Sequence, residues 1–240
     1  MFANQSMITL PQSQVAESAP ASRACNGVSA RPLYQLCKRI VDFVSSGVLL
    51  VICAPIWLLL ALMIKLDSKG PVFFVQSAVG YKEREFLLYK FRSMFPNSQQ
   101  SNHFADVERN FHRSEPTGAD SKGPIFKTAL TDKSRITRVG RFLRRTSLDE
   151  LPQIWNVLRG DMSFVGPRPA LPYEARLYKE WQKQRFLVRP GLTGLYQVTA
   201  RNRVPIDEMI HLDLEYIRRQ SLWLDFKILL KTPAAMLSGL

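Results

Sequence analysis

The chain of 240 residues is 46% hydrophobic, which suffices for one sizeable folded core beside a polar tail and an apolar segment. Its formal net charge of +13 favours negatively charged partners, namely nucleic acid, an anionic membrane surface or phosphorylated small molecules. Cys25, Cys37 and Cys53 lie far apart with no histidine close by in sequence, which argues against a disulfide framework and a structural zinc site. We expect reduced thiols in a cytosolic setting, with Cys53 buried among apolar residues.

Residues 1–30 carry only two charged side chains, Glu17 and Arg23, among Gln, Ser, Ala and Pro. They have no periodic apolar face that a core could bury, and no basic stretch followed by an apolar run that would indicate a signal peptide. We predict a disordered tail over 1–30, a membrane helix over 31–66 and one folded domain over 67–240.

The membrane helix is predicted from residues 43–64, which contain no charged side chain. At about 1.5 Å per residue this segment is about 33 Å long, close to the roughly 30 Å thickness of a bilayer core. Pro55 near its centre removes a backbone donor and clashes with the preceding turn, which predicts a bend or a break.

Basic residues flank the apolar segment on both sides, whereas a spanning helix usually has them enriched on one side only. This pattern suits a helix that enters the membrane, breaks at Pro55 and returns to the same face, but a kinked spanning helix is equally compatible with the sequence. The flanking residues are Arg31, Lys38 and Arg39 before the segment and Lys65, Lys69, Lys82 and Arg84 after it.

The runs PVFFVQ (71–76) and REFLLYKFR (84–92) predict a β-hairpin with Gly80 in its turn. Side chains alternate along a strand, so Lys90 and Arg92 project from one face. They form either a solvated pair or part of an anion site.

The remaining chain predicts a polar surface loop at 97–124, with a short helix near 104–112. It also predicts a helix from 151 to 158, an amphipathic basic helix at 173–186, a short strand at LYQV (195–198) and an apolar helix at 221–230. The last could pack in the core or, like the basic helix, lie on the membrane surface. We therefore predict an α+β fold, mainly helical, with a membrane helix broken at Pro55, a small hairpin and amphipathic interfacial helices.

Asp149 and Glu150 form an acidic pair directly after a run of basic residues. Ser147 and Glu150 fit a capping box, and acids in a first turn complement the helix dipole, which would explain both carboxylates structurally. Pro152 disturbs this interpretation, because a helix capped by Ser147 would place it beyond the first turn. A later helix start, with Asp149 as the cap, suits Pro152 better.

The same acidic pair could also perform chemistry on phosphates, because Arg144 lies close by in sequence. Adjacent helical residues point about 100° apart, which favours two roles: one carboxylate attacks phosphorus and the other holds Mg²⁺. Pro167 and Pro169 stiffen the chain around Arg168, whose guanidinium could hold phosphate or simply be solvated. Asp161 is explained equally by a turn and by metal binding.

Three segments resemble the bacterial sugar transferase family of small monotopic phosphoglycosyl transferases: YKFRSM (89–94), TRVGRFLRRTSLDELPQIWNVLRGDMSFVGPRP (137–169) and RPGLTG (189–194). They occur in this order after a proline-interrupted apolar segment, and the likeness covers roughly residues 36–235. Within this family, the chain resembles the exopolysaccharide-initiating enzymes that transfer galactose 1-phosphate to undecaprenyl phosphate.

The resemblance implies that Asp149 attacks a UDP-sugar, such as UDP-galactose or UDP-glucose, and that undecaprenyl phosphate then accepts the sugar phosphate. It implies that Glu150 binds Mg²⁺ and that Arg144 and Arg168, with Lys90 and Arg92 as further contributors, hold phosphates. The membrane helix is then re-entrant and the domain lies on the cytoplasmic face of the bacterial inner membrane. A homodimer is compatible with this interpretation.

The chain departs from the family pattern at two positions. Ala54 replaces the serine common before the membrane proline, and Ala78 replaces an arginine common before the hairpin glycine. The first change leaves the backbone freed at Pro55 without a hydroxyl partner, and the second weakens the expectation of phosphate contacts from the hairpin.

The alternative hypothesis is a membrane-tethered basic protein that binds nucleic acid or anionic lipid without catalysis. Charge and the basic run at 133–145 would suffice for it, but it leaves the acidic pair unexplained. The sequence has no helix or aromatic motif that reads bases, so we expect no nucleic-acid partner.

Overall fold

The computed structural model describes residues 31–95, 135–200 and 204–238. The predicted tail at 1–30 and the predicted loop at 97–124 lie outside these residues. The described chain is mainly helical with two small two-stranded sheets, as the α+β prediction states. Its elements are α1 (Pro32–Asp67), β1 (Phe73–Val79), η3 (Tyr81–Glu83), β2 (Glu85–Phe91), α3 (Arg138–Thr146), η6 (Leu148–Glu150), α4 (Gln153–Arg159), β3 (Ser163–Val165), α5 (Pro172–Leu177), α6 (Glu180–Lys183), η7 (Gln184–Leu187), β4 (Gly191–Thr193), α7 (Leu195–Thr199), α8 (Ile206–Arg219) and α9 (Leu222–Ser238).

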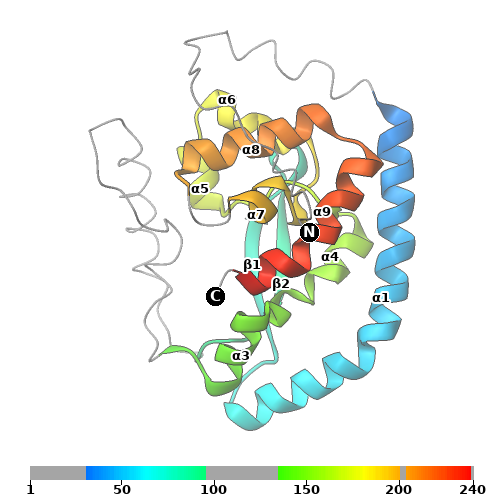
Figure 1. Ribbon diagram of the computed structural model, residues 1–240. Helices are drawn as coiled ribbons and strands as arrows, with labels where there is room; N and C mark the ends of the chain where they lie inside the picture. Colours follow the sequence, from blue (N-terminus) through cyan, green and yellow to red (C-terminus); the bar gives the residue numbers. More distant parts are fainter. Residues whose placement is uncertain (1–30, 96–134, 201–203, 239–240) are drawn as a thin grey trace, which may run out of the picture.

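Helix α1 is one α-helix of 36 residues with Pro55 in its interior, so of the predicted bend or break the structure shows no break, but the helix does bend along its course (Figure 1). A proline inside a helix removes one hydrogen bond and tilts the following turn, but the flanking turns can continue. Among the described residues α1 is the one helix long and apolar enough to cross a membrane, and only 11% of its most apolar window is buried. Cys53, which lies on this largely exposed helix, is therefore only partly buried and not fully buried as predicted.

Both ends of α1 are fastened to the same folded domain. At its start, Lys38 forms an ion pair of 2.7 Å with Asp225 of α9. At its end, Leu60 and Ile64 are buried against Phe91 and Leu143. The helix therefore runs down one side of the domain and passes beneath it (Figure 1), with a long apolar surface left exposed between the attachments.

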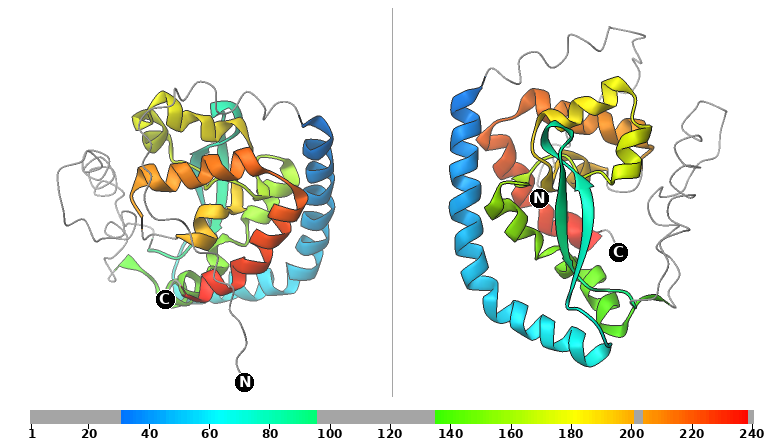
Figure 2. Two further views of the ribbon diagram at one scale, coloured as in Figure 1. Left: turned by 45° about the horizontal axis from the view of Figure 1, so that its top comes forward. Right: turned by 180° about the vertical axis from the view of Figure 1, so that it is seen from behind.

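The predicted hairpin is confirmed by the antiparallel pairing of β1 with β2, although β1 is shifted toward the turn. The register joins Phe73 to Phe91 and Val79 to Glu85. Seen from behind, the hairpin stands in front of α9, so the two lie on opposite faces of the molecule (Figure 2). Ala78 and Leu88 from the hairpin pack on Val157 of α4, which links this sheet to the helix that follows the acidic pair.

A second sheet was not predicted: β3 and β4 pair in parallel, with Ser163 opposite Gly191 and Val165 opposite Thr193. The two strands bring the proline-glycine segments 160–169 and 189–194 together. Gly166 allows this close approach, because a Cβ there would lie 2.5 Å from the carbonyl oxygen of Arg189.

Two local predictions differ from the structure, and a third is confirmed. LYQV lies in helix α7 instead of a strand, and the single helix predicted at 173–186 is divided into α5, α6 and η7. Tyr178 separates α5 from α6 with an extended backbone, while its ring enters the main core. The predicted apolar helix at 221–230 is confirmed and extends to Ser238 as α9.

Candidate active site

The acidic pair lies in the 3₁₀ turn η6, between α3 and α4, instead of in a helical first turn. Ser147 has a left-handed backbone, with φ of 55°, and its side chain makes no capping hydrogen bond, so the predicted capping box is wrong. Helix α4 begins only at Gln153, directly after Pro152. This late start satisfies the restriction that proline imposes, and it leaves both carboxylates in a short connection between two helices.

Cationic side chains approach the pair from two elements next to it in space. From β2, the Lys90 ammonium lies 3.4 Å from the Glu150 carboxylate. From α3, the Arg144 guanidinium interacts electrostatically with Asp149, while its Nε donates to the Ser93 hydroxyl at 2.9 Å. Burial lowers the pKa of Arg144, and the nearby Asp149 partly offsets this effect.

Arg168 reaches the same region from the loop after β3. Its guanidinium lies 3.5 Å from the Glu174 carboxylate, which is 1% exposed, and it also interacts with Glu150 over a longer distance. Burial by itself lowers the pKa of Arg168, but Glu174 and the other negative neighbours raise it overall. Arg168 is therefore held as a cation with about a third of its side chain exposed.

The Asp149 carboxyl has a raised pKa of about 6. Burial is the largest cause and the negative charge of Glu150 is the second, whereas Lys90 and Arg144 lower it. Near neutral pH the group is largely ionised, yet it is poorly solvated. A carboxylate in this state is a better nucleophile than a fully hydrated one, and the surrounding cations would attract a phosphate.

The predicted site residues Lys90, Arg144, Asp149, Glu150 and Arg168 thus come together. Arg92 does not join them, because its guanidinium is buried at the end of α1 and donates to the carbonyl oxygens of Ser68 and Lys69 at 2.7 and 2.9 Å. Arg92 thereby supplies hydrogen-bond donors to carbonyl groups at the C-terminal end of α1, a role that cationic side chains often take.

Asp161 is also separate from the acidic pair. It pairs with Arg159 at 3.2 Å, at the opposite end of α4 from Glu150. A helix of this length spans about 10 Å, whereas ligands of one Mg²⁺ lie about 2.1 Å from the ion, so Asp161 and Glu150 cannot share a metal.

The profile of one family, described as bacterial sugar transferase, matches residues 33–239. The chain belongs to the bacterial sugar transferase family. The matched region includes all of the described residues that form the site.

Several curated relatives of this bacterial sugar transferase come from different bacteria. It is 40% identical over 205 residues to the galactosyl transferase CpsE of Streptococcus agalactiae, covering 85% of this chain and 43% of CpsE. It is also 40% identical over 200 residues to the undecaprenyl-phosphate galactose phosphotransferase of Salmonella typhimurium, covering 83% and 40%. The chain thus spans less than half the length of both relatives. The exopolysaccharide production protein ExoY of Rhizobium meliloti is 36% identical over 211 residues, covering 88% of this chain and 90% of ExoY.

Sequence reasoning missed the residues that hold the site of this sugar transferase in place. Glu174 accepts from the Leu171 N–H at 2.8 Å and orients Arg168, and Ser93 orients Arg144. A local signal existed for Glu174, since Pro172 and Glu174 stand where a helix favours proline and a capping acid. No local signal exists for Ser93, whose role depends on contacts between distant segments.

The site of the sugar transferase fits a magnesium ion that a substrate helps to bind. The described residues contain no group of three or more His, Cys, Asp or Glu side chains that could hold a metal without help. Mg²⁺ commonly binds through one or two carboxylates together with substrate phosphates and water. Glu150, whose side chain is 40% exposed, offers such a carboxylate next to Asp149.

Proposed function

We propose that this chain transfers a sugar 1-phosphate from a UDP-sugar to undecaprenyl phosphate and releases UMP. The observation that carries the proposal is the partly desolvated Asp149 next to Glu150. Lys90 and Arg144 act electrostatically on Asp149, and Arg168 acts on Glu150. Relatives named as undecaprenyl-phosphate galactose and glucose phosphotransferases support this reaction class. Because these names differ in the sugar, UDP-galactose and UDP-glucose are both candidate donors.

In the first step a carboxylate oxygen of Asp149 attacks the β-phosphorus of the UDP-sugar. A bond forms between this oxygen and phosphorus, and the bond from phosphorus to the bridging oxygen breaks, with its electron pair leaving on UMP. The product is an acyl phosphate that carries the sugar on the aspartate. Arg144 and Arg168 would bind the phosphate oxygens, which carry more charge on the leaving UMP than in the donor.

In the second step a phosphate oxygen of undecaprenyl phosphate attacks the same phosphorus. The bond to Asp149 breaks, the carboxylate is regenerated, and the lipid carries the sugar through a diphosphate. Glu150 would hold Mg²⁺, and the bound ion would neutralise part of the negative charge on the diphosphate. The ion pair with Lys90 holds the Glu150 carboxylate close to the reacting aspartate.

We further propose that α1 is re-entrant and that the domain lies on the cytoplasmic face of the bacterial inner membrane. Both ends of α1 are attached to one charged domain, at Asp225 and at Phe91, while the stretch between them exposes many apolar side chains. A helix that crossed the bilayer would have one end on the far side. The bend in α1 lets its middle enter the membrane while both ends stay at the surface.

Helix α9 supports the same placement. Its side chains Trp223, Phe226 and Leu230 are 63%, 49% and 64% exposed, while Asp225 and Ile228 point inward. An apolar face of this kind suits a helix lying in the membrane interface, where aromatic rings are favoured.

The reaction is tested with membranes that contain the protein, UDP-sugars, undecaprenyl phosphate and Mg²⁺. We expect UMP release and a lipid-linked sugar phosphate, and we expect a donor labelled in its β-phosphate to leave label on Asp149 when the lipid is omitted. Asp149→Asn should abolish both. Unchanged UMP release by Asp149→Asn would refute the nucleophile, and no reaction with any UDP-sugar would refute the activity.

The topology is tested with single cysteines placed near residue 5 and near residue 120 in a chain without its native cysteines. Re-entry predicts that an impermeant thiol reagent labels both positions from the cytoplasmic side. Labelling of the two positions from opposite sides would mean that α1 spans the bilayer.

A further inference from the structure

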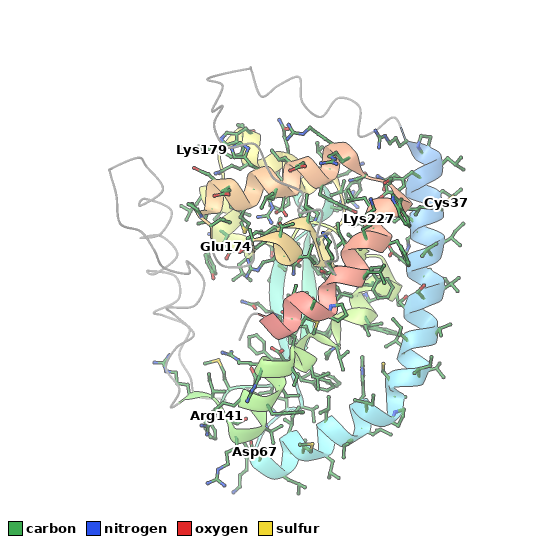
Figure 3. The ribbon with its side chains drawn as sticks, in the orientation of Figure 1. Cys37, Asp67, Arg141, Glu174, Lys179 and Lys227 are labelled. Atoms are coloured by element: carbon green, nitrogen blue, oxygen red, sulfur yellow. The ribbon has the colours of Figure 1, made fainter. Side chains whose placement is uncertain are left out.

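The outward face of α3 and the end of α1 form a basic surface, which we call the basic rim. Arg138, Arg141 and Arg145 of α3 are exposed, and so are Lys65 and Lys69 at the end of α1. The two helices are joined where the Asp67 carboxylate accepts from the Val139 N–H at 2.9 Å. Figure 3 shows Arg141 and Asp67 at this same end of the molecule.

The cations of the basic rim have no ion-pair partner within the part of the chain that the structure describes. Among the described residues, neither Arg138, Arg141 nor Arg145 forms an ion pair, and α3 itself contains no acid. The one carboxylate between the two helices, that of Asp67, is bonded to a backbone amide instead. Arg144, which belongs to the active site, points to Ser93 and Asp149 and is not part of this surface.

This arrangement opposes the stability of an isolated helix. Arg138 lies at the first position of α3, where the helix dipole disfavours a cation, and Arg141 and Arg145 stand four residues apart with like charge. Among the described residues no acidic side chain pairs with these arginines to relieve the repulsion between them. An external polyanion could do so, and it is therefore a suitable partner for this surface.

Apolar side chains beside the basic rim indicate which polyanion. Phe142 of α3 is 46% exposed, and Leu62 and Leu66 of α1 are 56% and 78% exposed. Nucleic acid offers no apolar medium for these groups, whereas a bilayer offers acyl chains directly beneath a layer of phosphates. Cations that border membrane-inserted apolar residues gain attraction from anionic lipids near the surface.

We propose that the basic rim binds the headgroup phosphates of anionic phospholipids and thereby fixes the tilt of the domain against the bilayer. This inference rests on the proposed insertion of α1 and is independent of the proposed chemistry. The rim holds lipid that is not a substrate, at the end of the molecule opposite α5 and α6 (Figure 1).

The test uses the full chain in phosphatidylcholine vesicles with a trace of spin-labelled phosphatidylglycerol or spin-labelled phosphatidylcholine. The immobilised fraction of each label in electron paramagnetic resonance gives its relative association with the protein. We expect a preference for phosphatidylglycerol of roughly threefold or more that decreases with salt. Arg138→Gln/Arg141→Gln should bring the preference close to one, and Lys65→Gln/Lys69→Gln should reduce it in part.

A matched control removes two exposed cations at the opposite end of the molecule, Arg176→Gln/Lys179→Gln, and should keep the preference (Figure 3 labels Lys179). All three double variants should release UMP in detergent as the parent does, which shows that they fold. No preference in the parent, or an equal loss in the control, would overturn the proposal. Retention of a short DNA duplex in detergent without lipid preference would assign the rim to nucleic acid instead. A parent that prefers phosphatidylglycerol but releases no UMP would refute the proposed chemistry alone.

Discussion

Arg39 of α1 donates a hydrogen bond of 2.7 Å to the carbonyl oxygen of Val157 in α4, and a second of 2.8 Å to that of Leu158. These carbonyls lie in the last turn of α4, whose other end follows Asp149 and Glu150. Helix α1 therefore closes the C-terminus of α4, the helix that begins shortly after the acidic pair. The position of α1 and the placement of the candidate active site are thus linked through α4.

Replacement of Arg39 should lower the stability of the domain. Arg39→Ala removes two charge-assisted hydrogen bonds to carbonyls, and we expect the free energy of unfolding to fall by about 2 kcal/mol. Denaturant unfolding of the detergent-solubilised chain measures this change. Arg176→Ala, which removes an exposed arginine from α5, serves as the control and should change stability by less than about 0.5 kcal/mol.

The raised pKa of Asp149 predicts how the first step depends on pH. In the proposed mechanism the nucleophile is the ionised carboxylate, so the rate of UMP release in a single turnover should rise with pH and reach half its maximum near pH 6. An ordinary aspartate would give a midpoint near 3.8. A flat profile between pH 5 and 8 would contradict the assigned environment of Asp149.

The same raised pKa predicts that the ionised Asp149 carboxylate lowers the free energy of unfolding of the domain. Above pH 6 the carboxylate is charged in both the folded and the unfolded chain, and the folded environment disfavours that charge. The difference between 3.8 and about 6 corresponds to about 3 kcal/mol. The cost is fully present above pH 6 and disappears as pH falls toward 4. Asp149→Asn should therefore be more stable than the parent at pH 8 and closely similar at pH 4, as measured by unfolding at both values.

Local pattern predicted which side chains of the candidate site come together, because most of them are adjacent in the sequence. Asp149, Glu150 and Arg144 lie within one turn and its preceding helix, and strand alternation placed Lys90 on a face that meets them. Arg92 was assigned the same face, but β2 ends at Phe91, so strand alternation no longer applies there. The carbonyls at the end of α1 then determine where its guanidinium goes.

Tertiary contacts decided the elements that were predicted wrongly. LYQV contains Tyr and Val, which favour strands, yet it forms the short helix α7, which packs against both α8 and α9. Its Tyr196 is 3% exposed and belongs to the main core. The parallel pairing of β3 with β4 joins segments 28 residues apart in register, at Ser163 and Gly191, which no local periodicity records.

The buried ion pair between Arg185 and Asp213 should be sensitive to loss of either partner. Its atoms are 2.7 Å apart with side chains 1% and 2% exposed, and Arg185 also donates to the carbonyl oxygen of Arg168 at 2.9 Å. Asp213→Ala leaves a buried cation unpaired and should cost about 3–5 kcal/mol of unfolding free energy. Exposed Glu215, paired with Arg219 at 2.6 Å, provides the control, since Glu215→Ala should cost no more than about 0.5 kcal/mol.

Two glycines in helices should respond to alanine in opposite ways. Gly140 of α3 lies against Ser93, and a Cβ there would overlap the Ser93 carbonyl, which is backbone and cannot rotate away. Because the Ser93 hydroxyl orients Arg144, Gly140→Ala should displace this arginine as well as destabilise the domain by several kcal/mol. At Gly47 of α1, an added Cβ would meet no atom within 4 Å, so Gly47→Ala should be neutral or stabilising by up to about 1 kcal/mol.

Unfolding and UMP release measured on both glycine variants separate the two effects. Gly140→Ala should lose both stability and rate, and Gly47→Ala should keep both. Equal behaviour of the two variants would mean that α3 and Ser93 are not in close contact.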